Sequence, residues 1–377
     1  AGCTGIVNLL GNGNGAIAFR ALGGSFNGFP SARVHLSGVD LFTQNYSGGN
    51  TYSFGELSGD ALSEIRGALN NSGMTTLSVG QLGTSSEFAG VITDGNPSAT
   101  ALSKYGAGIL TLSGANTYSG VTAIYEGTLK VLGSLGNTNV FVGGGAKLMG
   151  SGPVGSLLTV QTNGEVSPGN NPGAVGTMTT TGGVTINPSA KFYFDLSSNP
   201  ASGNDRIVNS GGVLNYVGPG SAHYEFNLLD GYLGAGTYTL ISGGTGTSAS
   251  NSPGLTHNLP PTTRQNFSMQ RSGGGSADTY VRLVVTNSAG DLTWTGANGG
   301  TWDLNATTNF SGGPGGDNKF YNLDKVTFAD GASTGTVSVS GTLQPREIAV
   351  NNAATAYSLG GSGVIGGGAK LTKTGTG

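Results

Sequence analysis

The sequence predicts an all-β chain in which short strands stack coil on coil into an elongated solenoid. A short cassette occurs twice: residues 102–108 read LSKYGAG and residues 371–377 read LTKTGTG. The six residues GGGAKL at 143–148 recur letter for letter at 366–371. Short strands that repeat and are joined by glycine turns are typical of chains that stack supersecondary units along one axis.

The composition favours an ordered, strand-rich chain over a flexible linker. Glycine accounts for 72 of 377 residues, charged residues for 9% and hydrophobic residues for 36%. Disordered chains combine low hydrophobicity with high charge, and this chain lacks the charge. Its apolar residues also fall in short alternating runs, such as ILTL at 109–112.

Charge and hydropathy exclude several classes of partner. The net charge is −3 and the 16 basic residues are dispersed, whereas nucleic-acid binding needs a concentrated positive surface. We therefore expect no nucleic-acid partner. No apolar run approaches the roughly 20 residues of a membrane-spanning helix. A signal peptide is absent or already removed, since no basic region precedes an apolar stretch at the N-terminus.

The single cysteine, Cys3, excludes a framework of internal disulfides. We expect an ordinary buried or incidental thiol there, with intermolecular pairing as the alternative.

The first segment, residues 1–73, is β-rich and forms the first coils of the predicted solenoid. A strand is expected at 14–19. Residues 60–66 are the best helix candidate because an N-cap-like Asp60 opens them, but glycines bracket the segment and so short a helix is marginal. A strand with a turn is the alternative there.

Residues 74–242 give the clearest strand pattern. Apolar and polar residues alternate over four to six positions bounded by Gly, Asn, Ser or Pro. Since alternate side chains face opposite sides of a strand, Leu110 and Leu112 point inward together and Thr111 points outward. Further strands are expected at 75–79, 87–92, 121–124 and 127–131.

The rhythm breaks at 243–278, within a loop-rich stretch bounded at 243–290. Two interpretations stay open for it: a loop with one strand, or a contact surface that projects from the rod and includes His257 and Arg264. Residues 291–377 form a second repeat unit that ends inside a repeat.

A family resemblance follows from the middle segment. Residues 108–120, GILTLSGANTYSG, with EGTL at 126–129, are similar to the passenger-associated strand repeat of bacterial autotransporters. Residues 166–173 resemble a turn of that family, and Trp294 and Trp302 resemble the opening of a further unit. The resemblance covers about residues 50–377. It implies a right-handed parallel β-helix exported to the bacterial outer surface, with coils of about 20–25 residues.

Parallel β-helices also build polysaccharide lyases and hydrolases, which need clustered carboxylates. The densest acidic set is Asp195, Asp205, Glu225 and Asp230, and its spacing can align two members on successive coils. Because Asp205-Arg206 also matches a structural signature of the resembled family, we predict no catalytic residue.

No cofactor or metal ion is expected. The histidines, His35, His223 and His257, lie far apart and lack metal-ligand spacing. The two tryptophans can stack on sugar rings, but the resemblance favours packing at the start of a unit.

The sequence thus predicts a non-enzymatic, extracellular structural or adhesive β-solenoid. Its expected partners are further copies, stacked end to end through open strand edges, and surface glycans or other cells. The alternative is a carbohydrate-binding or polysaccharide-cleaving β-helix.

Overall fold

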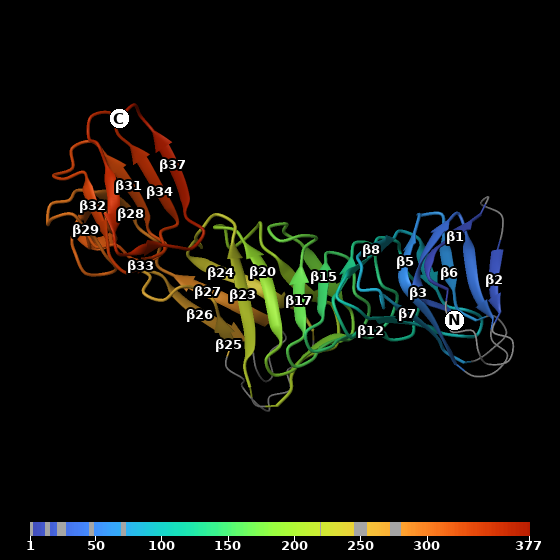
Figure 1. The fold of residues 1–377 in the computed structure, drawn as a ribbon. Helices are drawn as coiled ribbons and strands as arrows, with labels where there is room; N and C mark the ends of the chain where they lie inside the picture. The colour runs from blue at the N-terminus through green and yellow to red at the C-terminus, as the bar shows by residue number, and fades with distance from the viewer. Residues whose placement is uncertain are drawn as a thin grey trace.

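The computed structural model describes residues 3–11, 16–20, 28–44, 49–68, 73–218, 220–244, 255–271 and 280–377, with the backbone alone for 16–20 and 44. These residues form a long rod of stacked strands with a smaller unit at its C-terminal end, tilted away from the rod axis (Figure 1). The parallel β-helix that the sequence predicts is confirmed by the 18-stranded sheet. No helix in the described ranges has the length and apolarity needed to cross a membrane.

The strands of the described residues belong to six sheets. The 18-stranded sheet contains β1 (Gly5–Leu10), β3 (Gly28–Ser37), β5 (Asn50–Gly59), β7 (Thr75–Val79), β8 (Ser86–Phe88), β10 (Thr100–Lys104), β11 (Ile109–Leu112), β12 (Thr122–Ile124), β13 (Thr128–Val131), β14 (Val140–Val142), β15 (Lys147–Gly150), β16 (Leu158–Val160), β17 (Glu165–Pro168), β19 (Gly183–Ile186), β20 (Lys191–Leu196), β22 (Val213–Tyr216), β23 (Ala222–Leu228) and β25 (Leu255–His257). Two smaller sheets of the rod contain β2 (Ala16–Arg20), β4 (Asp40–Gln44), β6 (Glu64–Arg66) and β9 (Val91–Thr93), and β18 (Thr177–Thr180), β21 (Arg206–Asn209), β24 (Gly236–Ser242), β26 (Asn266–Arg271) and β27 (Tyr280–Thr286). The C-terminal unit contains β28 (Asp291–Trp294), β29 (Thr301–Trp302), β30 (Phe310–Ser311), the 3₁₀ turn η1 (Pro314–Gly316), β31 (Lys325–Ala329), β32 (Thr336–Val339), β33 (Thr342–Leu343), β34 (Glu347–Asn351), β35 (Ser358–Gly361), β36 (Val364–Ile365) and β37 (Lys370–Thr374).

The core of the rod is a set of apolar columns that run from coil to coil. Leu110 lies opposite Leu129, which lies opposite Leu148, and all three are buried. The predicted alternation is confirmed, because Leu110 and Leu112 are 1% and 0% exposed while Thr111 is only half-buried. Each inward side chain therefore packs on its counterparts in the coils before and after it.

Glycines let the coils approach one another at the corners. A Cβ atom at Gly114 would collide with the carbonyl oxygen of Gly90, and one at Gly133 with that of Gly114. The corner at Gly106 also has a φ of +68°, which other residues rarely adopt. The glycine content thus follows from close backbone packing between stacked turns.

Coil length changes along the rod. Lys147 lies opposite Thr128 and Glu165, 19 and 18 residues away, so these coils are shorter than the expected 20–25 residues. Further on, Lys191 lies opposite His223, 32 residues away. Glu165 lies opposite Lys191, 26 residues away, and the turn at 169–176 in this coil forms a wall of the pocket described below.

The helix considered at 60–66 is wrong, and its alternative, a turn and a strand, is confirmed by β6. The Asp60 carboxylate accepts hydrogen bonds from the Gly38 and Leu62 N–H groups, each at 3.1 Å, and from the Ser37 hydroxyl at 2.7 Å. These bonds, with Gly38 first, lower the pKa of Asp60 to about 2. Asp60 therefore fixes a turn, since its side chain bonds the neighbouring coil. The strand predicted at 14–19 is present as β2 from Ala16 on, and residues 14 and 15 lie outside the described part.

The rod and the C-terminal unit have separate hydrophobic cores. Within the described residues, one buried cluster runs from Val34 to Val285 and another from Leu292 to Ile348. The antiparallel pair β26–β27 closes the rod by pairing with β24. The stretch predicted as loop-rich thus contains β25, β26 and β27, and its residues 245–254 and 272–279 lie outside the described part.

Candidate functional site

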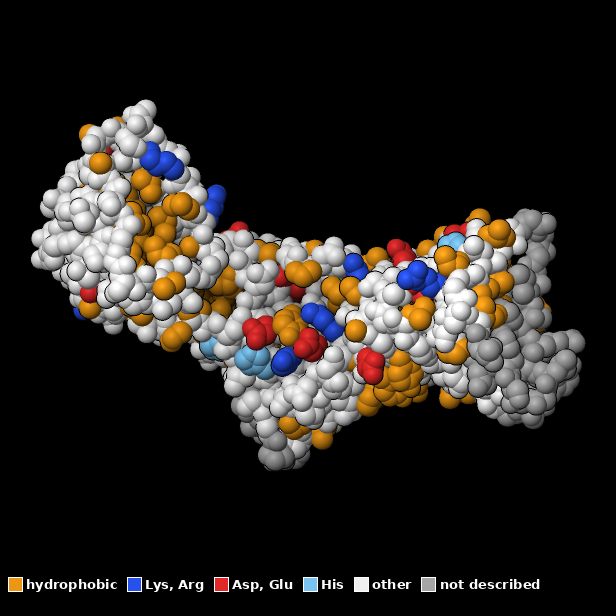
Figure 2. Space-filling model, in the orientation of Figure 1, with side chains coloured by type: hydrophobic (Ala, Val, Ile, Leu, Met, Phe, Trp, Pro, Cys, Tyr) orange, Lys and Arg blue, Asp and Glu red, His pale blue; other side chains and the backbone are white. Residues whose placement is uncertain are grey.

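Charged side chains gather on the outer face of the rod where the coils lengthen. Lys147, Glu165, Lys191 and His223 occupy matching outward positions on β15, β17, β20 and β23, in register from coil to coil. A second outward position places Tyr193 opposite Glu225. Figure 2 shows acidic, basic and histidine side chains gathered on this part of the molecule. The alternating strand pattern produces the columns, because every second side chain faces away from the core.

Two carboxylates hold the turn at 169–176 against this face. Asp195 accepts from the Gly173 N–H at 2.7 Å, and Asp205 accepts from the Gly176 N–H at 2.6 Å. Asp205 also accepts from the N–H of Asp195 at 2.9 Å, and the Asn227 amide donates to Asp195 at 2.6 Å. All four carboxylate oxygens therefore have a donor. The two aspartates build a rigid wall from a turn rich in glycine and asparagine.

A pocket of about 350 Å³ opens between this turn and the strands. Tyr193 and Pro172 of the turn give it apolar side-chain surface, while Phe194 and Phe226 reach its lining from buried positions in the core of the rod. Polar groups converge on an otherwise apolar lining, which is typical of small-molecule sites. The complete lining is Lys147, Ser167, Pro172, Tyr193, Phe194, Asp195, Asp205, Glu225, Phe226, Asn227 and Asn258.

The electrostatics of the pocket follow from burial and close charges. Burial raises the pKa of Asp205 to about 7, against the lowering effect of its two N–H donors. Burial also raises the pKa of Tyr193 to about 12. The Glu165 carboxylate contributes to this rise through its charge and by accepting a hydrogen bond from the Tyr193 hydroxyl. The Lys147 ammonium lies 4.1 Å from the centre of the Tyr193 ring, and burial lowers the pKa of this lysine. The tyrosine is thus held in place by a cation and an acceptor.

His223 connects a hydroxyl to a carboxylate at the edge of the pocket. Its Nε2 lies 2.8 Å from Glu225 Oε1, and its Nδ1 lies 2.6 Å from the Thr256 hydroxyl. Such a chain can move a proton, but acyl transfer also needs N–H groups aimed at a developing oxyanion. Here the N–H groups of β23 lie in a ladder between β20 and β25. The arrangement therefore orients Glu225.

Three of the four predicted carboxylates meet at the pocket. Asp195, Asp205 and Glu225 all line it, whereas Asp230 does not. Asp230 accepts from the Ser198 N–H at 2.7 Å, and this bond lowers the pKa of Asp230. The bonds made by Asp205 agree with the structural interpretation of the Asp205-Arg206 signature.

The remaining candidates from the sequence have local roles. His35 Nδ1 lies 3.0 Å from the Ser58 hydroxyl of the next coil, and His257 packs edge-on against Phe267. Burial lowers the pKa of His257. Cys3 is exposed, so a buried thiol is wrong there. Over the described ranges, no three His, Cys, Asp or Glu side chains come close enough to hold a metal ion.

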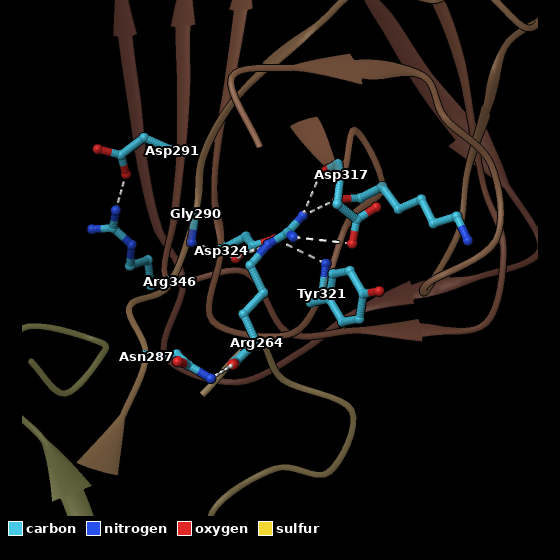
Figure 3. Close-up of polar contacts among 9 residues, drawn as sticks. Arg264, Asn287, Gly290, Asp291, Asp317, Tyr321, Asp324 and Arg346 are labelled. Carbon is cyan, nitrogen blue, oxygen red and sulfur yellow. Dashed lines mark hydrogen bonds and ion pairs between the residues drawn. The ribbon is translucent and has the colours of Figure 1, made fainter. Parts of the chain in front are cut away.

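Arg264 joins the loop-rich stretch to the C-terminal unit. Its guanidinium donates to Asp324 through Nε at 2.9 Å and to Asp317 through Nη1 at 3.2 Å, and it stacks 4.4 Å from the Tyr321 ring (Figure 3). The side chains of Arg264 and Asp324 are 8% and 0% exposed. Arg264, one of the two residues named for the predicted contact surface, thus binds the chain's own second unit.

The two tryptophans are packing residues, as expected from the sequence. Trp294 and Trp302 are 1% and 0% exposed, so neither presents a face to a sugar. The Trp294 indole donates to the Thr334 carbonyl at 2.9 Å. Both lie in the aromatic cluster of the second core.

Sequence reasoning missed Lys147, Tyr193 and Asn227, which complete the pocket. Their outward positions follow from strand alternation, as in KFYFD at 191–195. Their meeting follows from the register of successive coils of 18, 26 and 32 residues, for which the sequence offers no marker.

Comparisons with known proteins agree with this architecture. Residues 102–131 match the family described as passenger-associated-transport-repeat. Over 114 residues the chain is 32% identical to an extracellular serine protease of Serratia marcescens, which covers 30% of this chain and 10% of that protein. The chain thus spans about a tenth of the length of the curated relative it matches. The resemblance predicted from the sequence is confirmed, and both matches point to an extracellular or surface-exposed protein.

Proposed function

We propose that this chain, which carries a passenger-associated-transport-repeat at residues 102–131, is a non-enzymatic structural and adhesive rod of a bacterial surface protein. The observation that carries the proposal is the continuous parallel ladder from β1 to β25 over one buried core. Such a ladder fixes each coil between its neighbours, so the rod displays its outer face rigidly.

Exposed apolar side chains on strands β1 and β37 support association between copies. Among the described strands, β1 pairs only with β3, and β37 only with β34. Ile6 and Leu10 of β1 are 67% and 73% exposed, and Leu371 of β37 is 70% exposed. An open edge with apolar side chains is a template for another strand. We therefore expect copies of this chain to stack end to end.

Polysaccharide cleavage is the second candidate, and the meeting of Asp195, Asp205 and Glu225 in one pocket favours it. A hydrolase needs one carboxyl group to donate a proton and another to attack or to activate water. Asp195 and Asp205 have both oxygens occupied by N–H donors within the chain, which leaves Glu225 alone for chemistry. This occupancy supports binding in preference to cleavage.

Electron microscopy of the untagged chain at high concentration tests the proposal. We expect bent rods that join into fibres with an axial repeat near one molecular length. The double variant Ile6→Lys with Leu371→Lys should give separate rods, since lysine on an edge opposes pairing. Compact round particles would contradict the rod, and wild-type rods that stay separate would contradict the stacking.

A further inference from the structure

We infer that the pocket between the 169–176 turn and strands β17, β20 and β23 binds a neutral saccharide unit. This inference rests on the proposed adhesive function and specifies its ligand. The site is a hollow on the outer face of the rod, so a chain of sugars can reach it from solvent (Figure 2).

The pocket offers surfaces that complement both kinds of surface on a sugar ring. A sugar ring combines apolar C–H faces with hydroxyl groups that donate and accept hydrogen bonds. Tyr193 and Pro172 supply apolar contact within the pocket, because the rings of Phe194 and Phe226 are 1% and 5% exposed and belong to the core of the rod. Its volume of about 350 Å³ lies at the lower end of the range of about 300–1,000 Å³ for ligand sites, which suits one or two sugar units.

The polar groups have free capacity toward the pocket. Glu225 uses Oε1 to bind His223, and no described residue bonds its other oxygen. Asn227 uses its amide N–H to bind Asp195, which leaves its carbonyl oxygen to accept. Lys147 and Ser167 add donors. The pocket thus offers both acceptors and donors to the hydroxyl groups of a sugar.

The charges select against other ligands. Asp195 and Glu225 repel an anionic group, so a sialylated or sulfated sugar is disfavoured in the pocket. Lys147 lies over the Tyr193 ring and repels an amine at the position where an aromatic ring would hold a cation. A neutral, hydroxylated ligand meets neither penalty.

The pocket walls do not depend on a ligand for their shape. The turn at 169–176 is held by N–H donors to Asp195 and Asp205, and Asn258 is held by both N–H and C=O of Phe226. A site that is already formed spends little free energy on ordering when the ligand arrives.

An array of immobilised oligosaccharides tests the inference, with probes that end in neutral hexoses, in sialic acid and in glucosamine. We expect the full chain to bind a neutral probe. Glu225→Gln should weaken that binding about tenfold, since a hydrogen bond to a charged acceptor is lost. Tyr193→Ala should do the same or more. The control Glu87→Gln changes an exposed glutamate that bonds Ser113, and it should bind as the wild type does.

Three outcomes would overturn the assignment of a neutral saccharide to this pocket. Absence of binding to every probe removes the site, and preference for sialic acid or glucosamine removes the neutral ligand class. Unchanged affinity in both pocket variants, with the circular dichroism of the wild type, places the binding elsewhere. Rods in the microscope without sugar binding would leave the proposed rod intact. Sugar binding without rods would contradict the rod alone.

Discussion

The rod and the C-terminal unit build their cores from different proportions of residues: the rod core is mainly aliphatic with some Phe and Tyr, and the smaller core is richer in aromatic side chains. In the rod, columns of Leu, Val and Ile repeat from coil to coil. In the C-terminal unit, the Trp302 ring packs edge to face with Phe320 at 5.3 Å and with Phe328 at 5.7 Å between centroids. A long solenoid gains stability from repeated neighbours, whereas a short unit needs large aromatic side chains and a fixed contact with its neighbour.

The repeated cassette shows the same contrast within one motif. Lys104 donates through Nζ to the carbonyls of Tyr105 and Gly106, both at 2.7 Å, and to Glu126 of the next coil at 3.2 Å. Lys373 donates to the two corresponding carbonyls, of Thr374 and Gly375. Lys104 is 1% exposed, while Lys373 is exposed. The same residues thus form the same corner, but a following coil is what buries it.

The largest expected effect comes from breaking the contact between the units. Arg264→Ala leaves Asp324 buried without its cation, which costs about 3–5 kcal/mol. We expect the C-terminal unit to unfold at a lower urea concentration, as followed by tryptophan fluorescence. Arg33→Ala, which removes the exposed Arg33 side chain from its ion pair with the partly buried Glu56, is the control and should cost about 1 kcal/mol or less. Equal effects of both variants would show that Arg264 does not couple the units.

A cavity in the core of the rod should destabilise the rod without destabilising the C-terminal unit. Leu129→Ala removes a fully buried side chain from the central column and should cost about 2–5 kcal/mol. We expect the midpoint of the urea transition followed by circular dichroism to fall, while the midpoint followed by fluorescence stays nearly unchanged. A parallel shift of both midpoints would mean that the two cores unfold as one.

The two cassette lysines sharpen the comparison further. Lys104→Met leaves three carbonyl acceptors without their donor and should cost about 1–3 kcal/mol in urea unfolding. Lys373→Met removes an exposed side chain and should have little effect. If the two variants lose the same stability, burial by the following coil is not what makes the first lysine important.

The free energy of unfolding of the rod should depend on pH through Asp205 in the pocket. The pKa of Asp205 is raised from 3.8 to about 7, so the folded chain holds a proton there that the unfolded chain releases. The contribution of Asp205 to the free energy of unfolding therefore falls as the pH rises between these values. Asp205→Asn should remove that slope when unfolding is measured at pH 5 and pH 8. Asp60 titrates below this window, because its pKa is about 2. A slope that persists in the variant would assign it to another group.

The sequence was sufficient for features that depend on local alternation and on repeats. The inward positions of Leu110 and Leu112 and the burial of Trp302 follow from strand pattern and resemblance. It was insufficient where coils change length, since the register of His223 on Lys191 depends on how far the turns leave the core. For that reason three carboxylates could be named, but their neighbours in the pocket could not.

The separate cores are tested most directly by urea unfolding of the wild-type chain, followed by tryptophan fluorescence and by far-ultraviolet circular dichroism. Both tryptophans of the chain lie in the C-terminal unit, so fluorescence reports that unit, while circular dichroism reports mainly the longer rod. We expect the fluorescence transition at a lower urea concentration, with a wider gap in Arg264→Ala. Coincident transitions in both proteins would contradict two cores joined through Arg264.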